Sequence, residues 1–540
     1  NKLKMAIPSL AMIPSGYKDG KVYSVLPTNG DGDFTFSRGS NATRVNKDGL
    51  IEDSLELGSE LVTNGSFDTD SDWSKLNGST ISGGVARVVA GGNIDGLSRW
   101  SLNQSVFQQN KTYQVTFKAR QVSGSGKFLA GRDYHPFMDK VITSSFDDYS
   151  FIVDSGSLDF IGDLVFGGLT SGDEFEIDNV SVKEVVSGYD LPRLDYSDSS
   201  CPSLLLEPQS TNLIEYSEDF TQGWTENNST VTNNQVISPD GTLNADKITK
   251  TSGDGGVVYS KSINGTYTVS SYIKADVSSW SLLYINFSGG TDGQVFFDLE
   301  NGVIGNEVSA DGFIENVGNG WYRCGATFTT PANLSDFRIF PSEPNSTTAT
   351  NGSIYVWGVQ LEEQSYTTSY IPTNGAIATR LADECVNTSA GSVIGQIEGT
   401  MFIEAENNPI AYLLNSPNNV IFGSINSGNY LNNFHFTTDS SNIYVYCNSG
   451  GALQAVIGTS LPSSSILKMA VTYTSSEIKF FVNGVLVGTD TSLNLPIGMN
   501  QIDVGHMGQQ PATQKMRGGI NNFILFDKEI TEAEAIALTS

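Results

Sequence analysis

Histidine, cysteine and charged residues are scarce in this chain of 540 residues. It has three histidines, four cysteines and only 16% charged residues. The cysteines (Cys201, Cys324, Cys385 and Cys447) lie far apart and form no C-x-x-C pair, so neither a zinc ribbon nor a dithiol redox motif is indicated. So few cysteines in so long a chain also exclude a scaffold built on disulfides, and we expect free thiols.

Basic residues are outnumbered by acidic ones. There are 30 Lys and Arg against 59 Asp and Glu, which gives a formal net charge of −29. Because nucleic acids and anionic membranes both attract basic surfaces, this charge argues against either as a partner. No apolar run approaches the ~20 residues that cross a bilayer. The N-terminal MAIPSLAMIP is interrupted by Pro8 and Pro14, so it is a poor apolar region for a signal peptide. We therefore expect no nucleic acid and no membrane insertion.

Helical periodicity is missing until about the last dozen residues. The chain is instead rich in Gly, with 56 residues, and in short alternating apolar runs separated by turns. Asn483–Gly484 between two such runs predicts a type I′ hairpin. Thr531 and Glu534 predict a capping box that opens a short C-terminal helix. The chain is too long for one core. The sequence thus predicts an all-β protein of three jelly-roll or β-sandwich domains, joined by irregular straps, with one short C-terminal helix.

Turns, prolines and apolar patterns divide the chain into five segments. A turn-rich N-terminal segment buries little alone and is expected to lean on a neighbour. A strap containing Pro192, Pro202 and Pro208 has one apolar run, Leu204–Leu206, that is too apolar for a free linker. The expected segments are 1–56 (N-terminal segment), 57–186 (first β-sandwich), 187–212 (strap), 213–383 (second β-sandwich) and 384–540 (last β-sandwich).

The first β-sandwich carries a specific set of motifs. They are NGSFD at 64–68, Trp73, KTYQVTF at 111–117 and IDNVSV at 177–182. Together they resemble a carbohydrate-binding module of the jelly-roll type. In that family a structural calcium is often held between the opening acidic residue and the closing Asp-Asn-Val strand. The resemblance implies Asp68 and Asp178 as calcium ligands, and oxygen ligands suit Ca²⁺. The alternative is that both aspartates cap turns.

A sugar site in this domain would use exposed aromatics for sugar faces and polar groups for hydroxyls. Trp100, Tyr134 and His135 stand in polar, loop-like contexts, and Arg132 lies beside the last two. We therefore predict carbohydrate binding by Trp100, Arg132, Tyr134 and His135. The alternative is that these aromatics are structural, as we expect of Trp73.

The other two β-sandwiches offer fewer candidates. Trp321 and Trp357 lie inside apolar strands and are expected in a core, whereas Trp280 and Tyr284 are weaker ligand candidates. The last domain has no Trp. A sugar site there would draw on a small set of other rings: Tyr430, His435, Tyr444, Tyr446 and His506.

The last domain contains SEIKFFVNGVLVGTD and, near its end, GGINNFILFDKEITEAEAIAL. This order of hairpin, terminal strand and acidic helix resembles the laminin G-like, concanavalin A-like lectin sandwich. That fold also hosts glycosidases, which need two carboxylates flanking the bond that is cut. Glu404 and Glu406 point to one strand face, but a solvated strand face explains that pattern, and we expect no catalysis.

Three further segments resemble bacteriophage virion fibre or adhesin proteins. They are IPSGYKDGKVYSVLPTNGDGDFTFSRGSNATRVNKDGLIE (13–52), PRLDYSDSSCPSLLLEPQSTNLIEYSEDF (192–220) and VWGVQLEEQSYTTSYIPTNGAIATR (356–380). In such proteins the first segment can run almost directly into the second. Residues 57–186 are therefore interpreted as an insertion, which a sandwich with adjacent ends permits. Residues 1–53 and 189–212 are then expected to be neighbours in space.

The resemblance implies a virion-surface protein, assembled in the host cytoplasm, that is a homotrimer anchored to other virion structural proteins through residues 1–56. As a tail or head fibre or adhesin it would bind host surface glycans without catalysis. Two alternatives stay open. One is a purely structural fibre, collar or capsid-decorating protein that binds no glycan, and the other is a glycan-degrading depolymerase.

Overall fold

A computed structural model of the chain describes residues 6–92, 100–132, 135–156, 162–187, 189–197, 199–253, 255–330, 333–346, 352–406, 420–428, 431–439, 441–508 and 515–540. Regular structure in these ranges consists of strands, apart from one 3-10 turn, η1 (Ala390–Ser392), and one helix, α2 (Glu532–Thr539). The prediction of an all-β, multi-domain fold is therefore confirmed. The chain divides into two compact units, and one of them is formed by residues 55–187 with 236–244.

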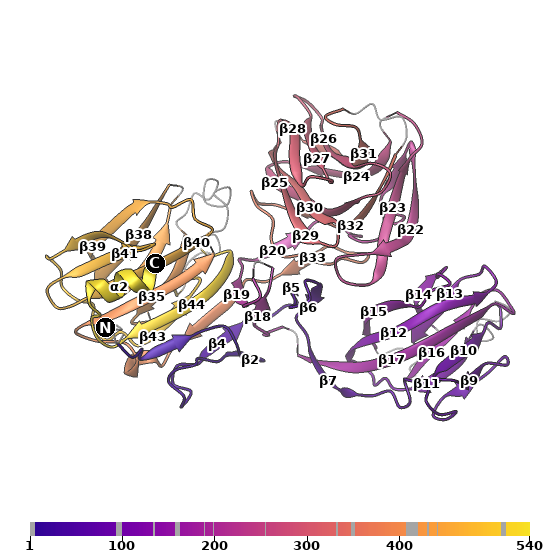
Figure 1. Cartoon of the computed structure of the whole chain (residues 1–540), viewed down its shortest axis with the longest axis horizontal. Coiled ribbons are helices and arrows are strands. Elements are labelled where there is room, and N and C mark those ends of the chain that lie inside the picture. Colours follow the sequence, from indigo (N-terminus) through magenta and orange to yellow (C-terminus); the bar gives the residue numbers. More distant parts are fainter. Residues whose placement is uncertain are drawn as a thin grey trace. The chain divides into compact units, whose positions relative to one another are not determined.

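The last sandwich consists of two antiparallel sheets (Figure 1). The first is named the β44 sheet and runs β18 (Arg193–Asp195), β19 (Ser203–Leu206), β44 (Gly518–Phe526), β35 (Gly399–Glu406), β40 (Ile466–Tyr473), β41 (Ile478–Val482) and β42 (Val485–Asp490), with β1 (Leu10–Met12) also pairing β44. The second, the β43 sheet, runs β2 (Tyr17–Lys18), β3 (Lys21–Val22), β4 (Phe34–Ser37), β34 (Glu384–Asn387), β43 (Gln501–Val504), β36 (Val420–Asn426), β37 (Asn433–Thr438), β38 (Asn442–Ser449) and β39 (Ala452–Ser460).

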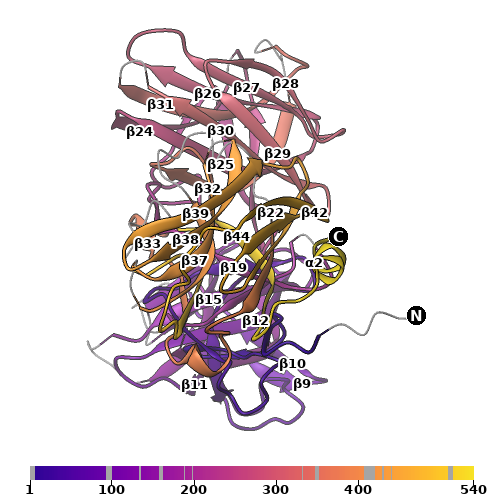
Figure 2. The same cartoon turned by 90° about the vertical axis from the view of Figure 1, so that its left-hand side faces the viewer.

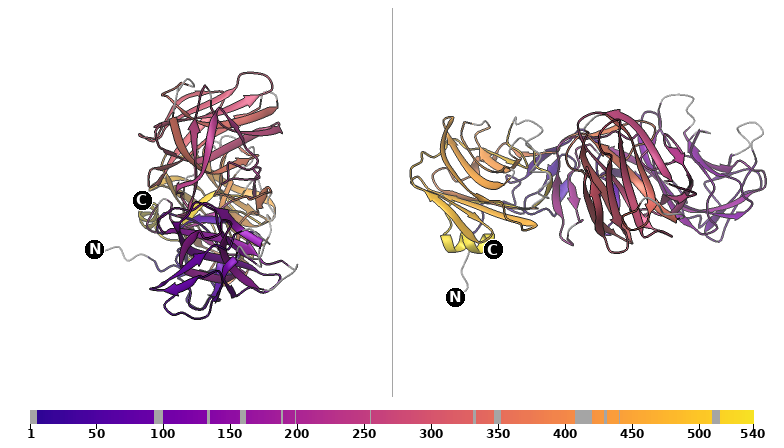
Figure 3. Two further views of the ribbon diagram at one scale, coloured as in Figure 1. Left: turned by 90° about the vertical axis from the view of Figure 1, so that its right-hand side faces the viewer. Right: turned by 90° about the horizontal axis from the view of Figure 1, so that it is seen from above.

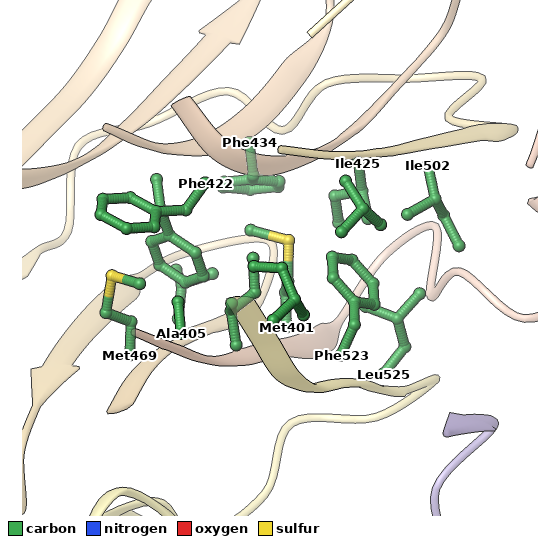
Figure 4. Close-up of a cluster of buried hydrophobic side chains, with 14 of the residues drawn as sticks. Met401, Ala405, Phe422, Ile425, Phe434, Met469, Ile502, Phe523 and Leu525 are labelled. Atoms are coloured by element: carbon green, nitrogen blue, oxygen red, sulfur yellow. The ribbon is translucent and has the colours of Figure 1, made fainter. Parts of the chain in front are cut away.

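The core of this sandwich follows from the two-residue period of its strands. Met401 and Ala405 of β35 point inward together with Phe523 of β44, because alternate side chains of a strand share a face. They meet Phe434 and Ile502 of the opposite sheet, and Figure 4 shows these side chains between the two layers.

The N-terminal segment and the strap supply strands to the last sandwich. The strap is more regular than its prolines predicted, because Pro192 and Pro202 stand just before the short strands β18 and β19 instead of inside them. Leu204 of β19 pairs with Ile520 of β44. Leu204 and Leu206 are buried in the same cluster as Val22, Phe34 and Phe36.

Hydrogen bonds join the N-terminal segment to the strap. The backbone N–H groups of Arg38 and Gly39 donate to the Asp190 carboxylate over 2.8 and 2.9 Å, and that of Val45 donates to Asp195 over 2.8 Å. The side chains of the strap therefore satisfy backbone donors of a segment that lies about 150 residues earlier in the chain.

Five buried charged side chains tie these segments to the end of the second sandwich. Arg193 contacts both Glu207, over 2.7 Å, and Asp383. Arg38 reaches Asp383 over 3.2 Å, and Arg380 reaches Glu207 over 3.4 Å. Buried charges persist only when they are paired and hydrogen-bonded, so this ion cluster holds its segments in one arrangement.

The second sandwich also has two sheets. The first, the β32 sheet, runs β22 (Ser229–Ile237), β23 (Leu243–Lys250), β32 (Gly352–Glu362), β25 (Thr266–Ala275), β30 (Trp321–Thr329) and β29 (Asp311–Gly318). The other, the β31 sheet, runs β21 (Thr225–Asn227), β24 (Gly256–Ile263), β31 (Leu334–Ser342), β26 (Trp280–Phe287), β27 (Gly293–Asp298) and β28 (Val303–Val308). Trp321 and Trp357 are buried, as predicted.

The first sandwich lies within the unit of residues 55–187. One sheet runs β15 (Asp147–Asp154), β12 (Thr112–Ser123), β17 (Glu174–Ser187), β10 (Val85–Val89) and β9 (Thr80–Ser82), with β7 (Glu56–Glu60) also pairing β17. The other, the β16 sheet, runs β14 (His135–Lys140), β13 (Phe128–Arg132), β16 (Asp163–Gly168), β11 (Trp100–Ser105) and β8 (Ser74–Lys75). Trp73 is 5% exposed and packs against Phe67 in the core between the sheets, as predicted.

Two local predictions are confirmed in the last sandwich. Asn483 and Gly484 both have positive φ, at 45° and 79°, in the turn between β41 and β42. Thr531 and Glu534 form the reciprocal capping box of α2. Ala535 of helix α2 packs beside Phe481 and Phe526 of the β44 sheet. Figure 3 shows this helix, next to the C-terminus, on the outside of the sandwich.

The four cysteines are free thiols, as predicted. Within the described ranges, no helix combines the length and the apolar character needed to cross a membrane.

Candidate functional site

The outward face of the β43 sheet carries polar side chains that are buried. Every residue of β36 and β37 is buried, although an antiparallel sheet that packs on one side normally alternates buried and exposed positions. Two cross-strand rows make up this surface, which we name the polar face: Asp503–Ser424–His435–Tyr446 and Gln501–Asn426–Asn433–Asn448.

Asp503 is the centre of the polar face. Its carboxylate is fully buried and accepts hydrogen bonds from Asn426 Nδ2 over 2.8 Å, Gln501 Nε2 over 2.7 Å and the Gly508 N–H over 2.9 Å. Ser424 Oγ lies 3.4 Å from the same carboxylate. A buried carboxylate needs several such donors, and they fix its orientation.

His506 follows β43 and lies beside this carboxylate. Its side chain is 4% exposed, and neither ring nitrogen has a hydrogen-bond partner among the described residues. Burial lowers the pKa of His506, and the nearby positive charge of Lys515 acts in the same direction, whereas Asp503 and Glu384 oppose them. Neutral imidazole has one donor and one acceptor, and buried polar atoms without partners are rare in proteins. The two ring nitrogens can therefore serve a bound polar group.

Lys515 provides the positive charge of this region. It is 7% exposed and donates to Glu384 over 2.6 Å. Its backbone forms an isolated bridge with Ile421 of β36, so the ion pair lies at the margin of the β43 sheet.

Three aromatic side chains, those of His435, Tyr444 and Tyr446, lie where the polar face extends onto β38. The rings of His435 and Tyr446 are parallel within 8°, with centroids 5.2 Å apart. His435 shares a 2.8 Å hydrogen bond with Asn433, and burial lowers its pKa to about 4, so it is neutral at pH 7. Tyr444 and Tyr446 are half-buried neighbours, and the Tyr444 hydroxyl donates to Asp439 over 2.8 Å.

The chemistry of the polar face suits a ligand with many hydroxyl groups. The Asp503 carboxylate and the Asn426 amide already have partners within the face, and Asn433 binds His435 and Asn448. The neutral ring of His506 supplies one donor and one acceptor that have no partner among the described residues. Partly exposed tyrosine rings at the margin offer apolar surface for sugar C–H groups.

The predicted sugar site of the first sandwich has a different structure from the one expected. The prediction that Trp100 is exposed in a loop is wrong. Trp100 begins strand β11, is 2% exposed and packs against Leu129 and Val165. Its indole occupies space left by Gly131, where an added Cβ would lie 2.7 Å from Trp100 Cη2. The polar flanking residues concealed this packing, which depends on distant strands.

Two of the other predicted residues, Arg132 and His135, lie on the same sheet as Trp100. Arg132 and His135 pair across the hairpin of β13 and β14, and the Arg132 guanidinium donates to the carbonyl of Ser155. His135 is exposed. Tyr134 lies outside the described residues. Trp100, Arg132 and His135 thus lie on strands of one sheet, and their carbohydrate binding stays a prediction.

The two predicted calcium ligands lie in different surroundings. Asp68 is exposed and accepts from Ser66 Oγ over 2.7 Å, and Asp178 lies in β17 and accepts from the Asn179 N–H over 2.7 Å. No group of three or more His, Cys, Asp or Glu residues in the described part of the chain could hold a metal ion. The carboxylates that are described do not fit a calcium site of their own, and calcium binding stays a prediction.

In the last domain the structure joins several residues that the sequence offered only singly. His435, Tyr444 and Tyr446 lie on the adjacent strands β37 and β38, while Tyr430 lies outside the described residues. Asp503 was not a candidate. Its position in the alternating run QIDV indicated an outward side chain, but its burial depends on distant parts of the chain. Glu404 and Glu406 lie on the β44 sheet, away from the polar face. Glu404 accepts a hydrogen bond from Asn522 Nδ2, and Glu406 accepts one from the Gly519 N–H.

A family model described as the Concanavalin A-like lectin/glucanases superfamily, Laminin_G_3, matches residues 408–536. These residues include β36 to β44 and every residue of the polar face. The last sandwich is therefore a concanavalin A-like domain. No curated protein matches the chain.

Solved structures with similar folds include carbohydrate-binding modules. A CBM40 module of the Ruminococcus gnavus IT-sialidase, bound to α2,3-sialyllactose, is 17% identical, covers 27% of this chain and 84% of its own, and has a TM-score of 0.23. The tandem CBM22 domains of Paenibacillus barcinonensis Xyn10C are 13% identical, cover 58% of this chain and 99% of their own, and have a TM-score of 0.22. A SAP-like pentraxin of Limulus polyphemus is 10% identical, covers 27% and 70%, and has a TM-score of 0.22. Similarity at this level carries no argument about a ligand.

Proposed function

We propose that the protein is a non-catalytic glycan-binding protein whose last sandwich binds sugar on the polar face. One observation carries the proposal. A concanavalin A-like domain presents rows of polar side chains around the buried Asp503, together with a buried His506 whose ring nitrogens have no partner among the described residues.

Hydrogen bonding explains why a sugar would suit this surface. Each sugar hydroxyl both donates and accepts, so it can pair with either ring nitrogen of His506, which lies beside the fixed carboxylate of Asp503. Partners that are already held in place lose little conformational entropy on binding.

A glycan array of the full-length protein tests this function. We expect binding to at least one glycan, and we expect Asp503→Asn to weaken it at least tenfold, because the variant keeps the shape of the side chain but loses the charge. Tyr446→Ala tests the margin of the face without removing a buried charge. Glu404→Gln, on the outward face of the other sheet, is the matched control and should bind like the wild type. Binding that survives both Asp503→Asn and Tyr446→Ala would contradict a site on the polar face.

The absence of catalysis is also part of the proposal. Incubation of the protein with its bound glycan should release no new reducing ends over hours. Release of such ends would favour the depolymerase alternative.

We further propose that the protein acts on the surface of a bacteriophage virion, as a homotrimeric tail or head fibre or adhesin attached to other virion proteins. Support comes from the resemblance of residues 13–52, 192–220 and 356–380 to such proteins. Mass spectrometry of purified particles tests the location, and light scattering tests the trimer. A virion protein that binds no glycan would support the structural alternative, a fibre, collar or decorating protein.

A further inference from the structure

The outward face of the β31 sheet carries aromatic rings that are partly open to solvent. Along β26, Leu283 and Ile285 point into the core of the second sandwich. Trp280 and Tyr284 point the other way and are half-buried. The next strands of this sheet are β27 and β28, as Figure 2 shows. We name the outward face of the β31 sheet the aromatic face.

A buried apolar floor lies between these two rings. Phe340, Leu282 and Phe296 are in register on three adjacent strands and are 1%, 0% and 3% exposed. Trp280 Cζ3 lies 2.6 Å from where a Cβ of Gly305 would be, so the ring rests on the backbone of β28. Outward faces of sheets are normally polar, so a packed aromatic surface in this place needs an explanation.

Polar side chains adjoin the aromatic floor in the next row. Arg338, Tyr284 and Gln294 are in register, and Arg338 Cζ lies 5.5 Å from the centre of the Tyr284 ring. The Tyr284 hydroxyl donates to Asp292 over 2.6 Å, and Asn286 Nδ2 donates to Asp336 over 2.7 Å. These hydrogen bonds hold the ring and the amide in fixed orientations before any ligand arrives.

The positive charge of this row has a carboxylate partner, and a second carboxylate, that of Asp292, adjoins Tyr284. Arg338 Nε donates to Asp336 over 2.8 Å, so the guanidinium is paired with a carboxylate beside it. The chain as a whole has a net charge of −29, which repels polyanions. A neutral ligand therefore fits the aromatic face better than an acidic one.

We propose that the aromatic face is a second carbohydrate-binding site, one that takes an extended neutral polysaccharide. Trp280 and Tyr284 lie four residues apart on one strand, a separation of about 13 Å at the usual rise per residue. They therefore stack on different sugar rings of the same chain, while Asn286, Gln294 and Arg338 bind its hydroxyls. The site is independent of the polar face, because it lies on another sandwich and selects a polymer by its apolar ring faces.

Affinity electrophoresis of the full-length protein tests the proposal. The probes are four neutral polymers (xylan, glucomannan, dextran and hydroxyethyl cellulose) and two acidic ones (alginate and polygalacturonate). We expect at least one neutral polymer to retard the protein and the acidic ones to have little effect. Trp280→Ala should raise the dissociation constant for the retarding polymer at least tenfold, and Tyr284→Ala should raise it several-fold.

Tyr355→Ala is the matched control, because Tyr355 is a half-exposed tyrosine on the other sheet of the same sandwich. It should bind like the wild type, and all variants should keep the wild-type circular dichroism spectrum. The proposal is overturned if no neutral polymer retards the protein, or if Trp280→Ala and Tyr355→Ala bind alike. It is also overturned if Trp280→Ala changes the oligomeric mass in light scattering and leaves retardation unchanged, since the aromatic face would then be a contact between copies of the chain.

Discussion

At the scale of single residues, burial decides what the polar groups of this protein can do. His435 is buried as a neutral ring, and its pKa is lowered to about 4. A base whose pKa is lower in the folded state than in the unfolded state stabilises the fold fully above its unfolded pKa, near 6.5, and less as the pH falls.

We therefore expect the unfolding free energy of the last sandwich to fall between pH 7 and pH 4.5, with about 2 kcal/mol of the loss due to His435. Denaturant unfolding of the wild type and of His435→Gln at pH 7, 5.5 and 4.5 measures this contribution. The variant should lose less stability than the wild type. Equal losses in the two proteins would show that His435 does not cause the dependence.

The absence of a side chain at Gly131 leaves the space that the indole of Trp100 occupies. An added methyl group at Gly131 would overlap the indole, so Gly131→Ala should destabilise the first sandwich by about 1–3 kcal/mol. Gly58→Ala is a suitable control, since its Cβ would have no atom closer than 3.5 Å. Thermal unfolding monitored by tryptophan fluorescence compares the two variants, and similar melting temperatures would contradict the packing described for Trp100.

At the scale of elements, predictions from the sequence succeeded where the signal is local. The Asn483–Gly484 turn and the capping box of α2 depend on residues within one turn of each other, and both are present. The pairing of β19 with β44 joins residues more than 300 positions apart. No local pattern carries that information, because the register of a strand is set by the face it must bury.

The strap shows the consequence for stability. Leu204 and Leu206 point into the core of the last sandwich, and Leu205 between them is half-buried on the other face. Leu204→Ala should lower the unfolding free energy by about 2–5 kcal/mol, and Leu205→Ala by less than about 1 kcal/mol. Chemical denaturation of both variants checks the alternation, which would be wrong if Leu205→Ala cost as much as Leu204→Ala.

Only part of the candidate site could be predicted, because single residues can be read from the sequence but strand register cannot. Single rings such as His435 and Tyr446 could be named from the sequence, but their stacking needed the register of β37 and β38. Asp503 could not be selected, since its burial on an outward sheet face is a tertiary property, and His506 could be named only as a single ring. For Trp100 the sequence predicted exposure and the structure shows burial, because the residues next to it in the chain are polar although its ring is buried.

At the scale of the whole molecule, the buried ion cluster is the feature that unites distant segments. Burial would raise the pKa of Glu207, but the guanidiniums of Arg380 and Arg193 outweigh it and hold that pKa below its usual range. A carboxylate with a lowered pKa stabilises the fold above its unfolded pKa, near 4.5, and this stabilisation is lost as the pH falls below that value.

Glu207→Gln should therefore destabilise the protein strongly, by about 3–5 kcal/mol, because Asp383 is then left to balance Arg193, Arg380 and Arg38. Limited proteolysis and thermal unfolding at pH 7 measure the loss, with Glu404→Gln as the control. Below pH 4 the wild type should approach the variant. A variant as stable as the wild type at pH 7 would show that the cluster does not hold these segments together.

The central claim is that a concanavalin A-like sandwich in this chain binds glycans on its polar face. The most direct measurement is glycan-array binding by the full-length protein, with Asp503→Asn beside Glu404→Gln. The account predicts a glycan that the wild type and Glu404→Gln bind equally and that Asp503→Asn binds at least tenfold more weakly. Equal binding by all three proteins, or no binding by the wild type, would contradict it.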